Sequence, residues 1–170
     1  PQGDAAGEMW LSLANSFGQQ GNLEEAAVIY ASAALKLEPA RQDEAALSST
    51  HLWFALGNFD KASKSAQALV EKTSNPKMKS RALILLAQGS EGLRDNDKAV
   101  RFSKAALSLD GTLQDASLII AKYGSDSDLE NLQRRILSSQ NNSSSEEAKA
   151  SEALYLIAER HFAASNGSEE

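Results

Sequence analysis

The chain has 170 residues, of which 42% are hydrophobic and 24% are charged, so it can bury a sizeable core and falls outside the disordered class. Its formal charge of −6 argues against nucleic acid as a partner, because phosphate binding requires a basic face. No apolar run approaches the roughly 18 residues of a membrane span, so we expect a soluble chain without membrane insertion.

The composition leaves the cellular compartment open. The chain contains no cysteine, which excludes disulfides and thiol nucleophiles but fits either a reducing or an oxidising environment. The cytoplasm is the favoured location, and the start at Pro1 indicates a piece of a longer or processed protein.

A short motif recurs along the first two thirds of the chain. Gly-Asn-Leu-Glu-Glu-Ala at residues 21–26 is followed by Gly-Asn-Phe-Asp-Lys-Ala at 57–62 and by Arg-Asp-Asn-Asp-Lys-Ala at 94–99. A period of about 36 residues is typical of stacked helical hairpins, none of which buries its apolar face alone. The spacing therefore predicts a helical array that presents a surface for binding.

The first unit has the most regular pattern. Its first helix carries apolar and small residues at fixed offsets, and its second helix carries an alanine and a tyrosine before a closing proline. These residues are Trp10, Leu13, Ala14, Phe17, Ala26, Tyr30 and Pro39. The pattern resembles the tetratricopeptide repeat family, whose signature has Trp, Leu-Gly and Tyr in the first helix and Ala, Phe and Pro in the second.

The resemblance implies a fold for the first two thirds of the chain. It implies an all-α, right-handed superhelical solenoid of antiparallel helix pairs, with units at about 5–40, 42–75 and 78–110. We expect small side chains where two helices cross closely. The alanines at these crossings are Ala14, Ala26, Ala62, Ala87 and Ala99.

The last third of the chain lacks the signature. Residues 111–139 predict a degenerate fourth helical pair, and the polar tract at 140–145 predicts a flexible linker. An amphipathic helix at 146–164 is expected to cap the solenoid, because a terminal unit otherwise exposes an apolar face. Its apolar stripe is Leu154, Ile157, Ala158, His161 and Phe162.

The resemblance also implies a concave groove lined by the first helix of each unit. Matched positions form an apolar row of Leu11, Leu47 and Ile84 and a polar row of Asn15, His51 and Gln88. Phe54 and Arg81 are further candidates for the groove, because aromatic and arginine side chains are enriched among the residues that contribute most to binding energy. Apolar anchors beside amide and imidazole groups suit a peptide or helix of a partner protein. The predicted function is that of a protein-interaction scaffold or adaptor.

A second interpretation stays open beside this one. The terminal helix at 146–164 could itself fill the groove, or be exchanged between copies in a homo-oligomer. The chain would then be a structural or self-association segment of a larger multidomain protein or complex.

No motif indicates catalysis, a metal or a cofactor, so we expect no enzyme activity. His51 and His161 lie on separate predicted helices without cysteine or histidine neighbours, which disfavours a metal site. Co-chaperones of the family clamp a terminal carboxylate, but Leu11, Ser48 and Leu85 occupy three of the clamp positions here. A carboxylate in the groove would lack most of its charged donors, so this function is not expected.

Overall fold

The structure, a computed structural model, describes residues 2–138 and 144–166, with side chains described except at 2–4, 40, 144–149 and 165–166. Within these ranges all regular secondary structure is α-helical, which confirms the expected all-α class. The helices are α1 (Gln2–Gln19), α2 (Leu23–Ala34), α3 (Pro39–Ala55), α4 (Phe59–Lys72), α5 (Pro76–Gly92), α6 (Asn96–Leu109), α7 (Gln114–Tyr123), α8 (Asp126–Ser138) and α9 (Ser144–Asn166).

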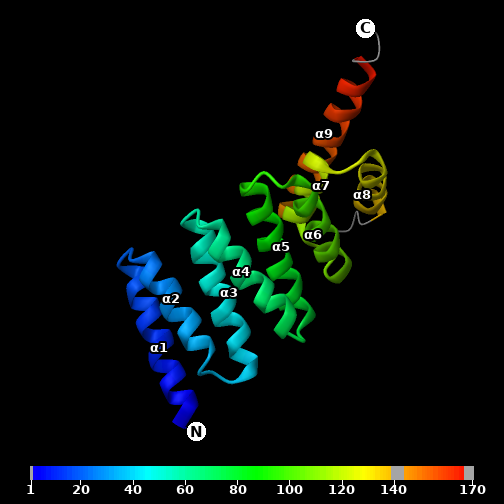
Figure 1. Ribbon diagram of the computed structural model, residues 1–170. Helices are drawn as coiled ribbons and strands as arrows, with labels where there is room; N and C mark the ends of the chain where they lie inside the picture. Colours follow the sequence, from blue (N-terminus) through cyan, green and yellow to red (C-terminus); the bar gives the residue numbers. More distant parts are fainter. Residues whose placement is uncertain (1, 139–143, 167–170) are drawn as a thin grey trace.

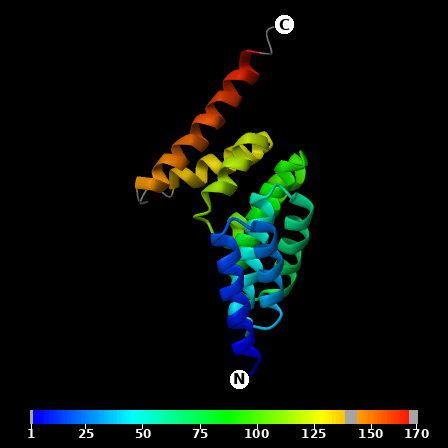
Figure 2. The same cartoon turned by 90° about the vertical axis from the view of Figure 1, so that its left-hand side faces the viewer.

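The helices follow one another in space as they do in sequence (Figure 1). From α1 to α7 each helix packs against its neighbours along the chain, and α5 also contacts α3 and α7. Figure 2 shows α1 to α6 as a stack of roughly parallel rods below α7 to α9. Contacts between successive helix pairs confirm the expected helical solenoid.

The five alanines expected at close crossings lie where two helices meet. Each is fully buried, with 0% of its surface exposed. A methyl side chain allows two helix backbones to approach closely while leaving no void between them. This observation ties the repeated alanine of the sequence to the packing of the stack.

The three repeated motifs form the turns between the paired helices. In each turn one residue has a positive φ angle, at Gly21 (81°), Gly57 (70°) and Arg94 (61°). The next residue is the N-cap of the second helix, and the side chains of Asn58 and Asp95 accept the N–H of Lys61 and Lys98. The turns therefore share one backbone conformation, although the third has no glycine.

Replacing Arg94 with glycine should stabilise the protein. A non-glycine residue in the left-handed region pays a steric cost that glycine lacks, and the greater flexibility of unfolded glycine offsets only part of the gain. We expect the free energy of unfolding to rise by about 0.5–1 kcal/mol in urea melts. The matched variant Gly57→Arg should lower it by a similar amount. Equal stabilities of Arg94→Gly and wild type would contradict this explanation.

Residues 111–139 depart from the regular hairpins. They hold α7 and α8, but α7 contacts α6 and α9 more extensively than it contacts α8. The expected linker at 140–145 lies largely outside the described residues, and its last two residues, Ser144 and Ser145, already belong to α9. The terminal helix therefore begins earlier than the sequence pattern indicated.

The stripe expected along α9 is wrong over its second half. Ala153 and Ile157 are buried, with 0% and 2% of their surfaces exposed, and Ile157 joins the main core. Phe162 is 69% exposed, however, because α9 leads away from the rest of the stack (Figures 1 and 2). The buried apolar contacts of α9 therefore centre on Ala153 and Ile157.

One arginine ties α9 to the end of α7. The Nη1 atom of Arg160 donates to the carbonyl oxygens of Gly124 at 2.8 Å, Ala121 at 3.3 Å and Lys122 at 3.4 Å. The last carbonyls of a helix lack partners within it and carry partial negative charge, so a guanidinium group suits this place. The contact fixes α9 across the end of α7.

Candidate protein-interaction surface

A cavity of about 470 Å³ lies between α1, α2 and α3. It is open to solvent and is lined by residues from the first helices of the first two units. Its lining residues are Asn15, Gly18, Gln19, Leu23, Tyr30, Ser48, His51 and Leu52. The Asn15–His51 cavity, as we call it, thus brings together two members of the expected polar row.

Tyr30 orients the amide at one side of this cavity. Its hydroxyl donates to the Oδ1 atom of Asn15, which leaves the amide N–H₂ of Asn15 for another acceptor. In the sequence, Tyr30 is singled out as a residue of the repeat signature. The signature could not indicate its hydrogen bond to Asn15, because a tyrosine fits this position whether it packs between helices or faces a polar surface.

His51 supplies the opposite side of the cavity. Partial burial, and secondly the positive charge of Arg81, lower the pKa of the His51 imidazole below its ordinary value. A neutral imidazole offers one N–H donor and one nitrogen acceptor. At neutral pH the cavity therefore presents amide, imidazole and hydroxyl groups without a fixed charge of its own.

Arg81 is exposed on α5, and its positive charge affects the pKa values of His51 and Asp110. Besides lowering the pKa of His51, it contributes to the lowered pKa of Asp110, where hydrogen bonds from Thr112 are the larger cause. Arg81 therefore extends the polar surface from α3 towards the turn that follows α6.

The apolar row expected in the groove is wrong for two of its three members. Leu47 and Ile84 are only 6% and 7% exposed and belong to the main hydrophobic core. They pack between helices instead of facing a ligand. Leu11 is half-buried against the separate cluster formed by Ala33, Leu37 and Ala45.

The remaining expected residues lie apart from the Asn15–His51 cavity. Phe54 is half-buried, and its ring centroid lies 5.6 Å from that of Phe59 on α4. Gln88 is half-buried on α5 and is absent from the cavity lining. The structure thus gathers Asn15 and His51, places Arg81 within electrostatic reach, and leaves Phe54 and Gln88 elsewhere.

The terminal helix does not occupy this surface. α9 packs on α7 and α8, and Figures 1 and 2 show it at the opposite end of the molecule from α1. The interpretation in which residues 146–164 fill the chain's own groove is therefore wrong. The surface at α1 and α3 is open to a partner.

Two further features bear on the class of the protein. Among the described residues, no group of histidine and acidic side chains is arranged to hold a metal ion. None of the helices in these ranges has both the length and the apolar character needed to cross a membrane.

Comparison with known proteins gives no family assignment. No protein-family model matches the chain, and no curated protein sequence matches it. The search of solved structures returns a structure of Pseudomonas aeruginosa PilF, which is 17% identical to this chain. The alignment covers 94% of this chain and 78% of that one, with a TM-score of 0.46.

Proposed function

We propose that this chain is a tetratricopeptide-like scaffold that binds an extended segment of a partner protein at the Asn15–His51 cavity. The observation that carries the proposal is the convergence of amide, imidazole and hydroxyl groups from α1, α2 and α3 on one open cavity of about 470 Å³. A peptide backbone presents alternating N–H and C=O groups, which such side chains can satisfy.

The arrangement also limits the chemistry of the partner. The Asn15 amide offers N–H donors, and the neutral His51 ring offers a donor and an acceptor. Arg81 adds a positive charge, which contributes to the lowered pKa of His51. A segment with an acidic side chain following its bound backbone would therefore complement this surface.

The test compares partner capture by wild type and by two double variants. Asn15→Ala with His51→Ala removes the two converging groups, neither of which belongs to the hydrophobic core, so helicity by circular dichroism should be unchanged. Gln67→Ala with Lys64→Ala removes exposed groups of α4 and serves as the control. A partner cross-linked to wild type in cells should be retained by the control and lost with the cavity variant.

The affinity measurement decides the outcome. Once the cross-linked segment is mapped, a fluorescent peptide of that segment should bind the cavity variant at least about tenfold more weakly than wild type, as expected for loss of a central contact. Equal affinity of wild type and the cavity variant would refute this binding site.

Self-association is the second candidate function, and one observation favours it. Met9 and Leu13 of α1 are 74% and 43% exposed, whereas Ala45 and Ala82, which hold the position of Met9 in α3 and α5, are 2% and 0% exposed. The preceding helix pair covers this face in the second and third units. A second copy could cover it in the first unit, and light scattering of Met9→Ser with Leu13→Ser should then show a lower mass than wild type.

A further inference from the structure

A second cavity lies between α6, α7 and α8, away from the surface proposed above. Its volume is about 180 Å³, well below the roughly 300–1,000 Å³ of sites for drug-sized ligands. Its floor is apolar and consists of Leu107, Ile120 and Leu132, which are 5%, 3% and 3% exposed. The cavity therefore suits a small group with an aliphatic part.

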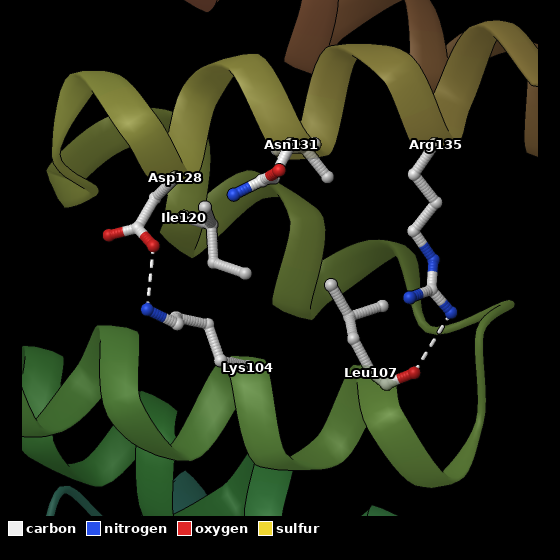
Figure 3. Close-up of a pocket in the computed structure, with 7 residues that line it drawn as sticks. Lys104, Leu107, Ile120, Asp128, Asn131 and Arg135 are labelled. Atoms are coloured by element: carbon white, nitrogen blue, oxygen red, sulfur yellow. Dashed lines mark hydrogen bonds and ion pairs between the residues drawn. The ribbon is translucent and has the colours of Figure 1, made fainter.

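Two polar bridges hold α8 across this cavity (Figure 3). At one end the Nζ atom of Lys104 lies 2.6 Å from Oδ1 of Asp128, and at the other Nη2 of Arg135 donates to the Leu107 carbonyl at 2.9 Å. The helix backbones of α6 and α8 make no extensive contact between these points. The bridges thus act as spacers, and the space between them stays open.

The hydrogen-bond acceptors at the rim are already used. Oδ1 of Asp128 faces Lys104, and its Oδ2 accepts the backbone N–H and the hydroxyl of Ser125. Oδ1 of Asn131 accepts a hydrogen bond of 2.8 Å from Arg134. Each of these three oxygen atoms therefore already accepts at least one hydrogen bond.

The hydrogen-bond donors at the rim still have N–H groups that could bind a ligand. With Oδ1 of Asn131 held by Arg134, its N–H₂ group points into the cavity (Figure 3). Among the described residues, the Arg135 guanidinium group donates through one of its nitrogens, to the Leu107 carbonyl, and the Lys104 ammonium group donates to one acceptor, Oδ1 of Asp128. Lys104 and Arg135 carry two positive charges against the single negative charge of Asp128.

From this pairing of free donors with an apolar floor, we infer that the cavity binds a small aliphatic carboxylate. The alkyl group would contact Leu107, Ile120 and Leu132, and the carboxylate would accept hydrogen bonds from Asn131 and Arg135. Charge-assisted bonds of this kind are the stronger class, and guanidinium groups match carboxylates in geometry. A free branched acid and the C-terminal residue of a peptide share this chemistry.

The experiment is a titration followed by nuclear magnetic resonance of the methyl groups of Leu107, Ile120 and Leu132. Isovalerate represents a free acid and N-acetyl-leucine represents a chain terminus. At least one of the two should cause saturable shifts, and the tighter of them identifies the source. N-acetyl-leucine amide keeps the alkyl group without the charge, and it should bind at least about tenfold more weakly than N-acetyl-leucine.

Two variants test recognition, and the second of them leaves both bridges intact. Arg135→Met keeps the aliphatic stem but loses the guanidinium group, while Asn131→Leu removes an exposed amide without touching either bridge. Both should weaken carboxylate binding about tenfold or more. Lys36→Met removes a charge on the distant C-terminal side of α2 and should bind as wild type.

Absence of methyl shifts, equal binding of the amide, or unchanged binding by both Arg135→Met and Asn131→Leu would overturn the assignment. The inference is independent of the proposed scaffold function, because the Asn15→Ala, His51→Ala variant should bind the carboxylate as wild type does.

Discussion

Replacing Ile84 with glutamate is expected to remove a large part of the protein's stability. Ile84 is 7% exposed and lies in the core cluster that runs from α3 to α9. A carboxylate there would lose its hydration without gaining a charged partner, so we expect a loss of about 4 kcal/mol or more in the free energy of unfolding. That loss is a large fraction of the stability of a small domain, which is roughly 5–15 kcal/mol. Urea melts followed by circular dichroism would measure it.

Two controls make this result specific. Ile84→Met keeps the volume and should cost less than about 1.5 kcal/mol. Arg81→Glu reverses an exposed charge on the same helix and should leave stability within about 0.5 kcal/mol of wild type. A stably folded Ile84→Glu protein would mean that this position faces solvent, as the sequence pattern alone suggested.

The pH dependence of Ile84→Glu provides a further check. Burial favours the neutral form, so the pKa of the introduced carboxyl is higher in the folded than in the unfolded state. The folded state then binds more protons, and the stability of the variant relative to wild type falls as pH rises. The deficit should therefore be smaller at about pH 4 than at about pH 7.

The second large effect is expected at Gly124, where the chain passes from α7 to α8. A Cβ atom built there would lie 2.6 Å from the carbonyl oxygen of Ile120 and 3.0 Å from the Cβ atom of Asp128. The first of these belongs to the backbone and cannot move without disturbing the end of α7. Gly124→Ala should therefore cost about 2–3 kcal/mol in urea melts, as overpacking does in other cores.

The matched control is Gly18→Ala near the end of α1. Its nearest neighbour would be the Cβ atom of Ala26 at 4.0 Å, an ordinary contact. Alanine is the better helix former, so this variant should gain up to about 1 kcal/mol. Opposite signs at the two glycines are the expected result, and stabilisation at both would refute the close approach at Gly124.

The sequence was sufficient to predict the helical array because the array depends on local signals. The turn motif and the buried alanine recur in each of the three units, and both are properties of short segments. A glycine with positive φ or an alanine at a close crossing can be recognised without knowing what lies beyond it. Arg94 shows the limit, since the third turn keeps the conformation without the residue that favours it.

The groove was predicted less well. Aligning the repeats shows which residues occupy equivalent positions, but it does not show how far each helix is rotated about its own axis. Leu47 and Ile84 do share a position, as expected, but that position faces the neighbouring helix. Asn15 and His51, a turn further along, do reach an open cavity. A small rotation of each helix decides between these outcomes, and it depends on the summed packing of side chains from several units.

The end of the chain depended on contacts that no local pattern encodes. The direction of α9 is set where Arg160 meets three carbonyl groups from the end of α7. The cavity beneath α8 exists because Lys104 and Arg135 each find a partner on the facing helix. Such pairings join residues far apart in sequence, and charged residues on a helix surface give no indication of them.

The way α1 and α2 join the stack has a consequence for how the molecule opens. α2 packs extensively against α3, whereas α1 reaches α3 through the ion pair of Glu8 with Arg41 and a few side chains, so the first hairpin is held mainly through α2. Local opening in arrays of this kind costs only the interface that is broken. Amide hydrogens of α1 should consequently exchange with deuterium sooner than those of α5, which is flanked on both sides. The first hairpin should therefore open locally while α3 to α7 stay folded.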